Sequence, residues 1–191
     1  MTAFDEAWEL AKMPIYHGTS TSSLPSIMRE GLKPTSQMPY AHFRQMVDDM
    51  GYDEDDPMFM QDFAYGVLDR LEEPTRYAIM AGSARDEVPV KGLRYPRQLY
   101  ADEEYHDRQF DPNKLPVILE MPDDGTWFED GLGRHGWGAD GWMRSEKTIP
   151  PEKIKVLAQA EPDMTVGQFI EMMRNRSKEM GFDFDDEELV S

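Results

Sequence analysis

A mixed α+β domain is the fold class that the sequence predicts, because its segments read in the order strand, helix, long helical stretch, strand, loop, strand, helix. A doubly wound sheet would instead alternate strands and helices along the whole chain. The clearest strand spans residues 114–122, an apolar run with a proline near each end. The clearest helix follows Thr165 and repeats its apolar residues at helical spacing: Val166, Phe169, Ile170 and Met173.

Glycine, proline and hydroxyl residues divide the start of the chain. Residues 4–12 read as a short amphipathic helix that Pro14 stops, and a strand begins at Ile15. The Thr/Ser run at 19–23 is expected to supply N-cap oxygens for the next helix, which should end at Gly31. The apolar residues expected on the buried face of that helix are Leu24, Ile27 and Met28.

The middle of the chain is predicted to be a largely helical insert over residues 40–90. Residues 41–50 suit a helix, and residues 58–71 are expected to be helical because their apolar residues recur every four positions. Residues 76–85 are expected to continue as helix after Pro74. A short strand is expected within residues 95–100.

The last third alternates loop and ordered segments. Residues 123–141 form a glycine-rich loop, whose tryptophans either line a substrate groove or anchor the loop: Trp127, Trp137 and Trp142. We expect that loop to close over a ligand. A closing strand is predicted at 154–157, and Gly181 should end the last helix. The acidic tail at 181–191 is expected to be disordered, which leaves one domain over residues 1–180.

Composition restricts the function classes. The net charge of −18 disfavours nucleic acid and anionic lipid as partners, and Lys91, Arg94 and Arg97 form the only candidate basic cluster. The charge serves solubility or a basic protein partner, and it also suits a salt-rich setting or a phage-encoded protein. No apolar run is long enough to span a membrane, and the acidic N-terminus does not read as a secretory signal. The absence of cysteine excludes thiolate chemistry and fits a cytoplasmic protein.

Three pieces of the sequence carry candidate chemistry. His17-Gly18-Thr19 at a strand tip offers an imidazole, a bare backbone and a hydroxyl to a small polar ligand. A flat ring could stack on one of several aromatic residues, namely Tyr77, Tyr95 or Tyr100. Glu146 lies just before Ile149-Pro150-Pro151. For each residue taken singly, the sequence favours a strand-end histidine bonded to backbone for His17 and a solvated surface charge for Glu146; only their sequence neighbours make them candidates for a site.

Two segments, YHGTSTSSLPSIMREGLKP (16–34) and SEKTIPPEKIKVL (145–157), resemble the His-Tyr-Glu type of the ADP-ribosyltransferase superfamily, which includes phage and bacterial enzymes. The resemblance implies a compact core built on a split β-sheet, with the helical insert and the C-terminal helix added to it. It also implies a tyrosine on or near a central strand. NAD would be the substrate, and no metal would be needed.

The resemblance assigns a role to each candidate residue. His17 would bond a ribose hydroxyl, the Gly18 backbone would pair with the nicotinamide carboxamide, and Thr19 or Ser20 would add a hydroxyl contact. Tyr77 or Tyr100 would stack on the nicotinamide ring. Glu146 would be catalytic, bonding the ribose, stabilising the cationic transition state and orienting the acceptor.

The expected activity is transfer of ADP-ribose from NAD to a macromolecular acceptor, with a protein as the first choice. Removal of an RNA 2′-phosphate is a second reading within the superfamily, and the acidic balance disfavours it. A third reading is a non-catalytic acidic module of the same fold that inhibits or recruits a basic partner. A plain structural protein is the fourth.

Overall fold

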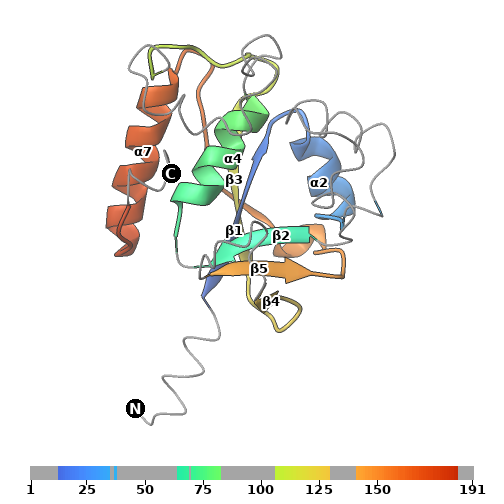
Figure 1. Ribbon diagram of the computed structural model, residues 1–191. Helices are drawn as coiled ribbons and strands as arrows, with labels where there is room; N and C mark the ends of the chain where they lie inside the picture. Colours follow the sequence, from blue (N-terminus) through green and yellow to red (C-terminus); the bar gives the residue numbers. More distant parts are fainter. Residues whose placement is uncertain are drawn as a thin grey trace, which may run out of the picture.

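The computed structural model describes residues 13–34, 37, 64–68, 70–82, 106–129 and 141–184. Within these ranges the fold is α+β, as the sequence predicts, and it is built on one six-stranded sheet with the order β4-β5-β2-β1-β3-β6 (Figure 1). Every pair of neighbouring strands in this sheet is antiparallel.

The strands are β1 Pro14–Ser20, β2 Ala64–Leu68, β3 Pro116–Pro122, β4 Phe128–Glu129, β5 Trp142–Ser145 and β6 Lys155–Gln159. The helices are α2 Leu24–Glu30, α4 Glu72–Gly82 and α7 Val166–Met180, with the short 3-10 helix η3 at Pro151–Lys153. In Figure 1, α4 and α7 lie on one side of β1 and α2 lies on the other.

The centre of the sheet is β1, which pairs unequally with its two neighbours. Its pairing with β3 runs along the whole strand, from Pro14↔Pro122 to Ser20↔Pro116. Its pairing with β2 comprises only Ile15↔Leu68 and Tyr16↔Val67. The ladder between β1 and β2 therefore ends at Tyr16, just before His17.

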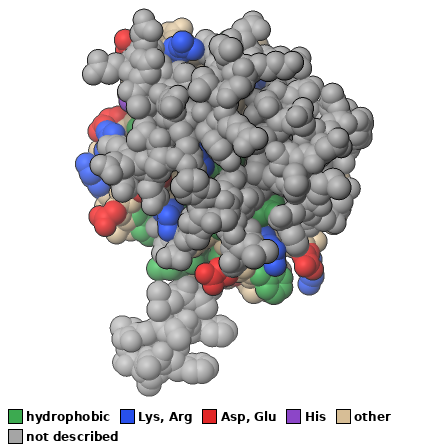
Figure 2. All heavy atoms as spheres, in the orientation of Figure 1, with side chains coloured by type: hydrophobic (Ala, Val, Ile, Leu, Met, Phe, Trp, Pro, Cys, Tyr) green, Lys and Arg blue, Asp and Glu red, His purple; other side chains and the backbone are tan. Residues whose placement is uncertain are grey.

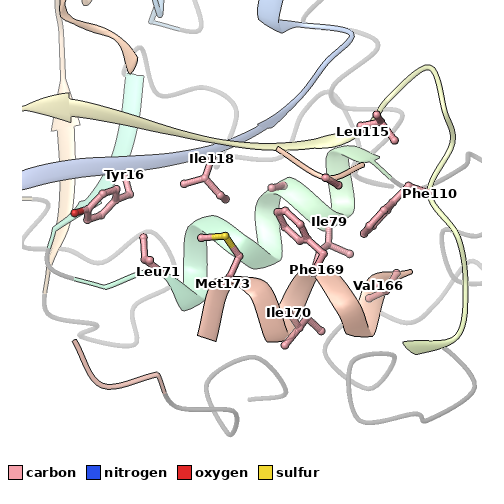
Figure 3. Packing of buried hydrophobic residues seen from close by; sticks show 12 residues of the cluster. Tyr16, Leu71, Ile79, Phe110, Leu115, Ile118, Val166, Phe169, Ile170 and Met173 are labelled. Atoms are coloured by element: carbon pink, nitrogen blue, oxygen red, sulfur yellow. The ribbon is translucent and has the colours of Figure 1, made fainter. Parts of the chain in front are cut away.

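Alternate residues of the central strands enter two hydrophobic cores. Tyr16 and Ile118 face α4 and α7, where they pack with Leu71, Phe169 and Met173 (Figure 3). The other face packs against α2 and the segment before η3: its buried residues include Ile15, Ile27, Val117, Leu119, Met121 and Ile149. We call these two sides the α4 face and the α2 face.

The C-terminal helix matches its prediction closely. Thr165 caps α7, with its hydroxyl accepting from the Gln168 N–H while the Gln168 side chain accepts from the Thr165 N–H. The helix ends at Gly181, whose φ of 80° is left-handed. All four residues predicted for its buried face are buried: Val166, Phe169, Ile170 and Met173.

The prediction of a helix over residues 58–71 is wrong for its described part. Residues 64–68 form β2, a strand buried on both faces, and so the region read as a helical insert supplies a central strand of the sheet. Burial on both faces removes the two-residue alternation by which a strand is usually recognised. The helix predicted at 76–85 is confirmed as far as Gly82, as α4, and residues 83–85 lie outside the described residues; α4 begins earlier, at Glu72, because Pro74 fits in its first turn.

Three smaller predictions also need correction. Ser23 is the N-cap of α2 but makes no side-chain cap bond, and Met28 is 41% exposed rather than buried. The tail is not disordered at its start, since Phe182 and Phe184 pack against the α4-face core. The helix predicted at 4–12, the helix at 41–50, the strand within 95–100 and the tail beyond Phe184 lie outside the described residues.

Candidate functional site

His17 bridges β1 and β2 at the point where their ladder ends. Its Nδ1 lies 2.9 Å from the carbonyl oxygen of Tyr65 on β2. Because a carbonyl oxygen only accepts, Nδ1 is the donor, and Nε2 is then the acceptor nitrogen of the neutral ring. Alternation along β1 places this half-buried imidazole on the α2 face.

Gly18 lies directly under α4. A Cβ at this position would come within 2.0 Å of the Pro74 carbonyl oxygen and 2.7 Å of the Ala78 nitrogen. The close packing of α4 on β1 therefore requires glycine at position 18, independently of any role of Gly18 in binding a ligand.

The backbone of Gly18 is directed toward β2. The Thr21 N–H donates to the carbonyl of Leu115, the residue before β3, in the same register as the β1–β3 ladder. Backbone groups of successive residues in a strand point to alternate sides, so those of Gly18 point away from β3. They face β2 beyond the last pair of the β1–β2 ladder.

The two hydroxyl residues after Gly18 are both buried. Thr19 is on the α2 face, and the Ser20 hydroxyl lies 2.8 Å from the hydroxyl of Ser22. The structure thus places both hydroxyls next to Gly18 but gives Ser20 a partner within its own loop.

An aromatic cluster covers β2 and β5 on the α4 face. It contains Tyr65, Val67 and Trp142, with Tyr77 of α4 packed against them. The rings of Tyr77 and Trp142 meet edge to face, with centroids 5.9 Å apart. Arg76 lies over the Tyr77 ring, 5.5 Å from its centroid, and forms a buried ion pair with Glu73.

Tyr65 is the residue that sequence reasoning missed. It belongs to the segment Ala64–Leu68, in which aromatic and β-branched side chains favour a strand. That signal was available in the sequence but was outweighed by the four-residue recurrence of apolar residues around it. Tyr77 is placed next to Tyr65 by the structure, whereas Tyr95 and Tyr100 lie outside the described residues.

Glu146 follows the last residue of β5 and is exposed. Ser145, which pairs with Ala64, is fully buried, and its hydroxyl lies 3.2 Å from both the N–H and the carbonyl oxygen of Lys147. These two contacts fix a turn that presents Glu146 at its apex. Only β2 separates β5, which Glu146 follows, from β1, which carries His17.

The segment before β4 is fixed by local hydrogen bonds and one ion pair. Asp124 accepts from the N–H and the hydroxyl of Thr126 and pairs with Lys153 of η3. Burial raises the pKa of the Asp124 carboxyl, but the bonds from Lys153 and Thr126 outweigh it, and the pKa is lowered overall. This segment leads to Trp127, which is 5% exposed. Trp127 and Trp142 are both buried, and Trp137 lies outside the described residues.

Neither metal binding nor membrane insertion finds support in the part of the chain that the structure describes. This part has no group of three or more metal-ligating side chains. None of its helices combines the length and the apolar character needed to cross a bilayer. Acidic and basic residues are nearly balanced there and are interspersed in Figure 2, so most of the net charge of −18 is carried by the remaining residues.

No protein-family model matches the sequence, and comparisons with curated proteins and with solved structures give no match.

Proposed function

We propose that this protein transfers ADP-ribose from NAD to a macromolecular acceptor, with a protein as the first choice. The observation that carries the proposal is the order β5-β2-β1 in the sheet. This order places β1, which carries the first of the two resembling segments, and β5, at whose end the second segment begins, on either side of β2, although the two segments are far apart in sequence. The ladder between β1 and β2 ends after Tyr16↔Val67, and this end of the ladder is the feature that we compare with the split sheet that the resemblance implies.

The resemblance implies a tyrosine on or near a central strand, and Tyr65 is a tyrosine on such a strand. It is in β2, and its carbonyl oxygen accepts the hydrogen bond from His17. Tyr77 lies beside it in the same aromatic cluster. The rings of Tyr65 and Tyr77 lie on the α4 face and His17 on the α2 face, so neither ring is assigned the stacking of the nicotinamide ring beside His17. That role stays proposed for Tyr100, which lies outside the described residues.

The backbone of Gly18 is the proposed partner of the nicotinamide carboxamide. An amide needs one acceptor for its N–H and one donor for its carbonyl oxygen. The C=O and N–H of Gly18 point toward β2 beyond the last pair of the β1–β2 ladder, and they would supply both. His17, through Nε2, would accept from a ribose hydroxyl next to this amide.

Glu146 is the proposed catalytic carboxylate. In the reaction, the bond between the ribose C1′ and the nicotinamide nitrogen breaks, and nicotinamide leaves with the electron pair. The carboxylate stabilises the positive charge that develops on the ribose. The acceptor then bonds to C1′ and releases a proton, for which Glu146 is the base.

Substitution of Glu146 tests this assignment. Glu146→Gln keeps the size of the side chain and removes its charge, and we expect transfer from labelled NAD to fall by about 10²- to 10⁴-fold with unchanged circular dichroism. Glu152→Gln is the matched control, because Glu152 is an exposed acid of η3 in the same sequence segment. Wild-type activity in Glu146→Gln would remove the proposed catalyst.

The alternative function is a non-catalytic acidic module that binds a basic partner. The net charge of −18 favours it. Calorimetric titration with NAD separates the two functions, because the module would not bind NAD even at millimolar concentration.

A further inference from the structure

We propose that Trp127 forms a wall of the dinucleotide site and that the ion pair between Asp124 and Lys153 positions it there. That the wall belongs to a dinucleotide site rests on the proposed function. The positioning of Trp127 by the ion pair does not, and it is tested separately below.

The first observation is the contact between Trp127 and β2. The Cη2 atom of Trp127 lies 3.5 Å from the place that a Cβ of Gly66 would occupy, so the indole lies over bare backbone. Gly66 directly follows Tyr65, whose carbonyl oxygen accepts the hydrogen bond from His17. Trp127 therefore covers the residue next to the His17–Tyr65 bridge, and it does so on the α2 face, where alternation also places His17.

The second observation is the state of the indole nitrogen. Nε1 of Trp127 is buried and has no hydrogen-bond partner in the structure. A buried donor without an acceptor destabilises the folded state by about 1–3 kcal/mol. The ring is therefore not held by its own polar atom, and its N–H is a donor that an acceptor oxygen of a ligand could satisfy.

The third observation explains what holds the ring. Two aspartates shape the segment before Trp127, but they have different partners. Asp123 accepts only a local bond, from the Gly125 N–H at 3.1 Å. Asp124 bonds locally to Thr126 through Oδ1 and reaches Lys153 through Oδ2. Asp124 thus ties the segment to η3 from a position three residues before Trp127.

The other end of this tie is itself fixed. The N–H of Lys153 donates to the Pro150 carbonyl, and Ile149 bridges to Leu32 in the segment after α2. The segment 150–153, Pro-Pro-Glu-Lys, therefore forms a rigid turn that holds Lys153 next to Asp124.

Nuclear magnetic resonance of the indole N–H groups tests the positioning. The chain has four tryptophans, so a ¹⁵N–¹H spectrum contains four indole signals, and Trp127→Phe identifies the relevant one. Asp124→Asn retains the acceptor for Thr126 but loses the charge. We expect solvent exchange of the Trp127 indole to rise roughly three- to fivefold in Asp124→Asn and in Lys153→Gln, the change that losing a partly exposed ion pair produces.

Two neighbouring substitutions serve as controls. Asp123→Asn removes the adjacent acid, and Lys155→Gln removes the next lysine, which pairs with Glu120 rather than with Asp124. Both should leave the exchange unchanged, and the charge-swapped Asp124→Lys/Lys153→Asp variant should restore protection. If Asp124→Asn and Lys153→Gln exchange as slowly as the controls, the positioning is refuted. If circular dichroism shows that Asp124→Asn or Lys153→Gln does not fold, the remaining variant and the charge-swapped variant decide whether the ion pair positions Trp127.

Binding of NAD tests the wall. We expect Trp127→Phe to weaken NAD binding severalfold and the Trp127 indole proton of the wild type to shift when NAD is added. If Trp127→Phe binds NAD as tightly as the wild type and the wild-type Trp127 indole signal does not shift when NAD is added, Trp127 is not a wall of the site. If the wild type does not bind NAD, both the proposed function and the role of Trp127 as a wall of the dinucleotide site fail. The exchange measurement still decides whether the ion pair positions Trp127.

Discussion

Adjacent residues of β1 serve different neighbours. His17 is directed to the α2 face and bonds to the carbonyl of Tyr65, whereas Gly18 contacts α4 and directs its backbone toward β2. The sequence predicted a polar tip with an imidazole and a bare backbone at these positions. It could not predict that Gly18 is also required by helix packing, because that requirement comes from Pro74 and Ala78, more than fifty residues away.

Replacement of Gly18 by alanine tests this packing. The added Cβ would meet the backbone of α4, which cannot rotate away as a side chain would. We expect Gly18→Ala to lower the free energy of unfolding in urea by about 1–3 kcal/mol or more. Gly125→Ala is a useful comparison, because Gly125 has open space around it and only the strain of a φ of 79°. If Gly18→Ala were as stable as the wild type, α4 would have to be free to move off β1.

Among the elements, α7 and β2 show why some predictions succeeded and another failed. The boundaries and buried face of α7 follow from local signals: a cap, a helical period and a terminal glycine. β2 is defined by strands on both sides of it, β1 and β5, which come from distant parts of the chain. Its five residues carry too little periodic information to outweigh the helical pattern around them. Tyr65, and with it part of the candidate site, was missed for this reason.

The cap of α7 provides a prediction at this scale. Thr165→Ala removes the acceptor for the Gln168 N–H and should lower the free energy of unfolding by about 1 kcal/mol. Thr165→Ser keeps the hydroxyl and should stay within a few tenths of a kcal/mol of the wild type. Urea unfolding followed by circular dichroism distinguishes the two variants. Equal loss in both would show that the methyl group of Thr165, and not its hydroxyl, matters.

Early and late parts of the described chain are joined by a contact between β1 and the segment after α7. β1, near the start of the chain, lies at the centre of the sheet, and Phe182, after α7, packs edge to face on Tyr16 with ring centroids 6.2 Å apart. Arg174 lies over the ring of Phe184. The acidic residues that follow these aromatics in the sequence gave the impression of a disordered tail from residue 181 onward, because composition alone does not show which residues find a core to pack against.

Phe182 therefore belongs to the folded unit, and its removal should have a measurable cost. We expect Phe182→Ala to lower the free energy of unfolding by about 1–3 kcal/mol, less than the full cost of a buried phenylalanine because the ring is only partly buried. Phe128→Ala is the control, since Phe128 is 55% exposed at the sheet edge and its loss should change stability by about 0.5 kcal/mol or less. Equal stability of Phe182→Ala and Phe128→Ala would mean that the contact with Tyr16 contributes nothing and that the folded unit ends with α7. A larger loss of unfolding free energy in Phe182→Ala than in Phe128→Ala would instead show that the folded unit extends past Gly181. Only a residue that is packed in the native state can destabilise that state when its side chain is removed.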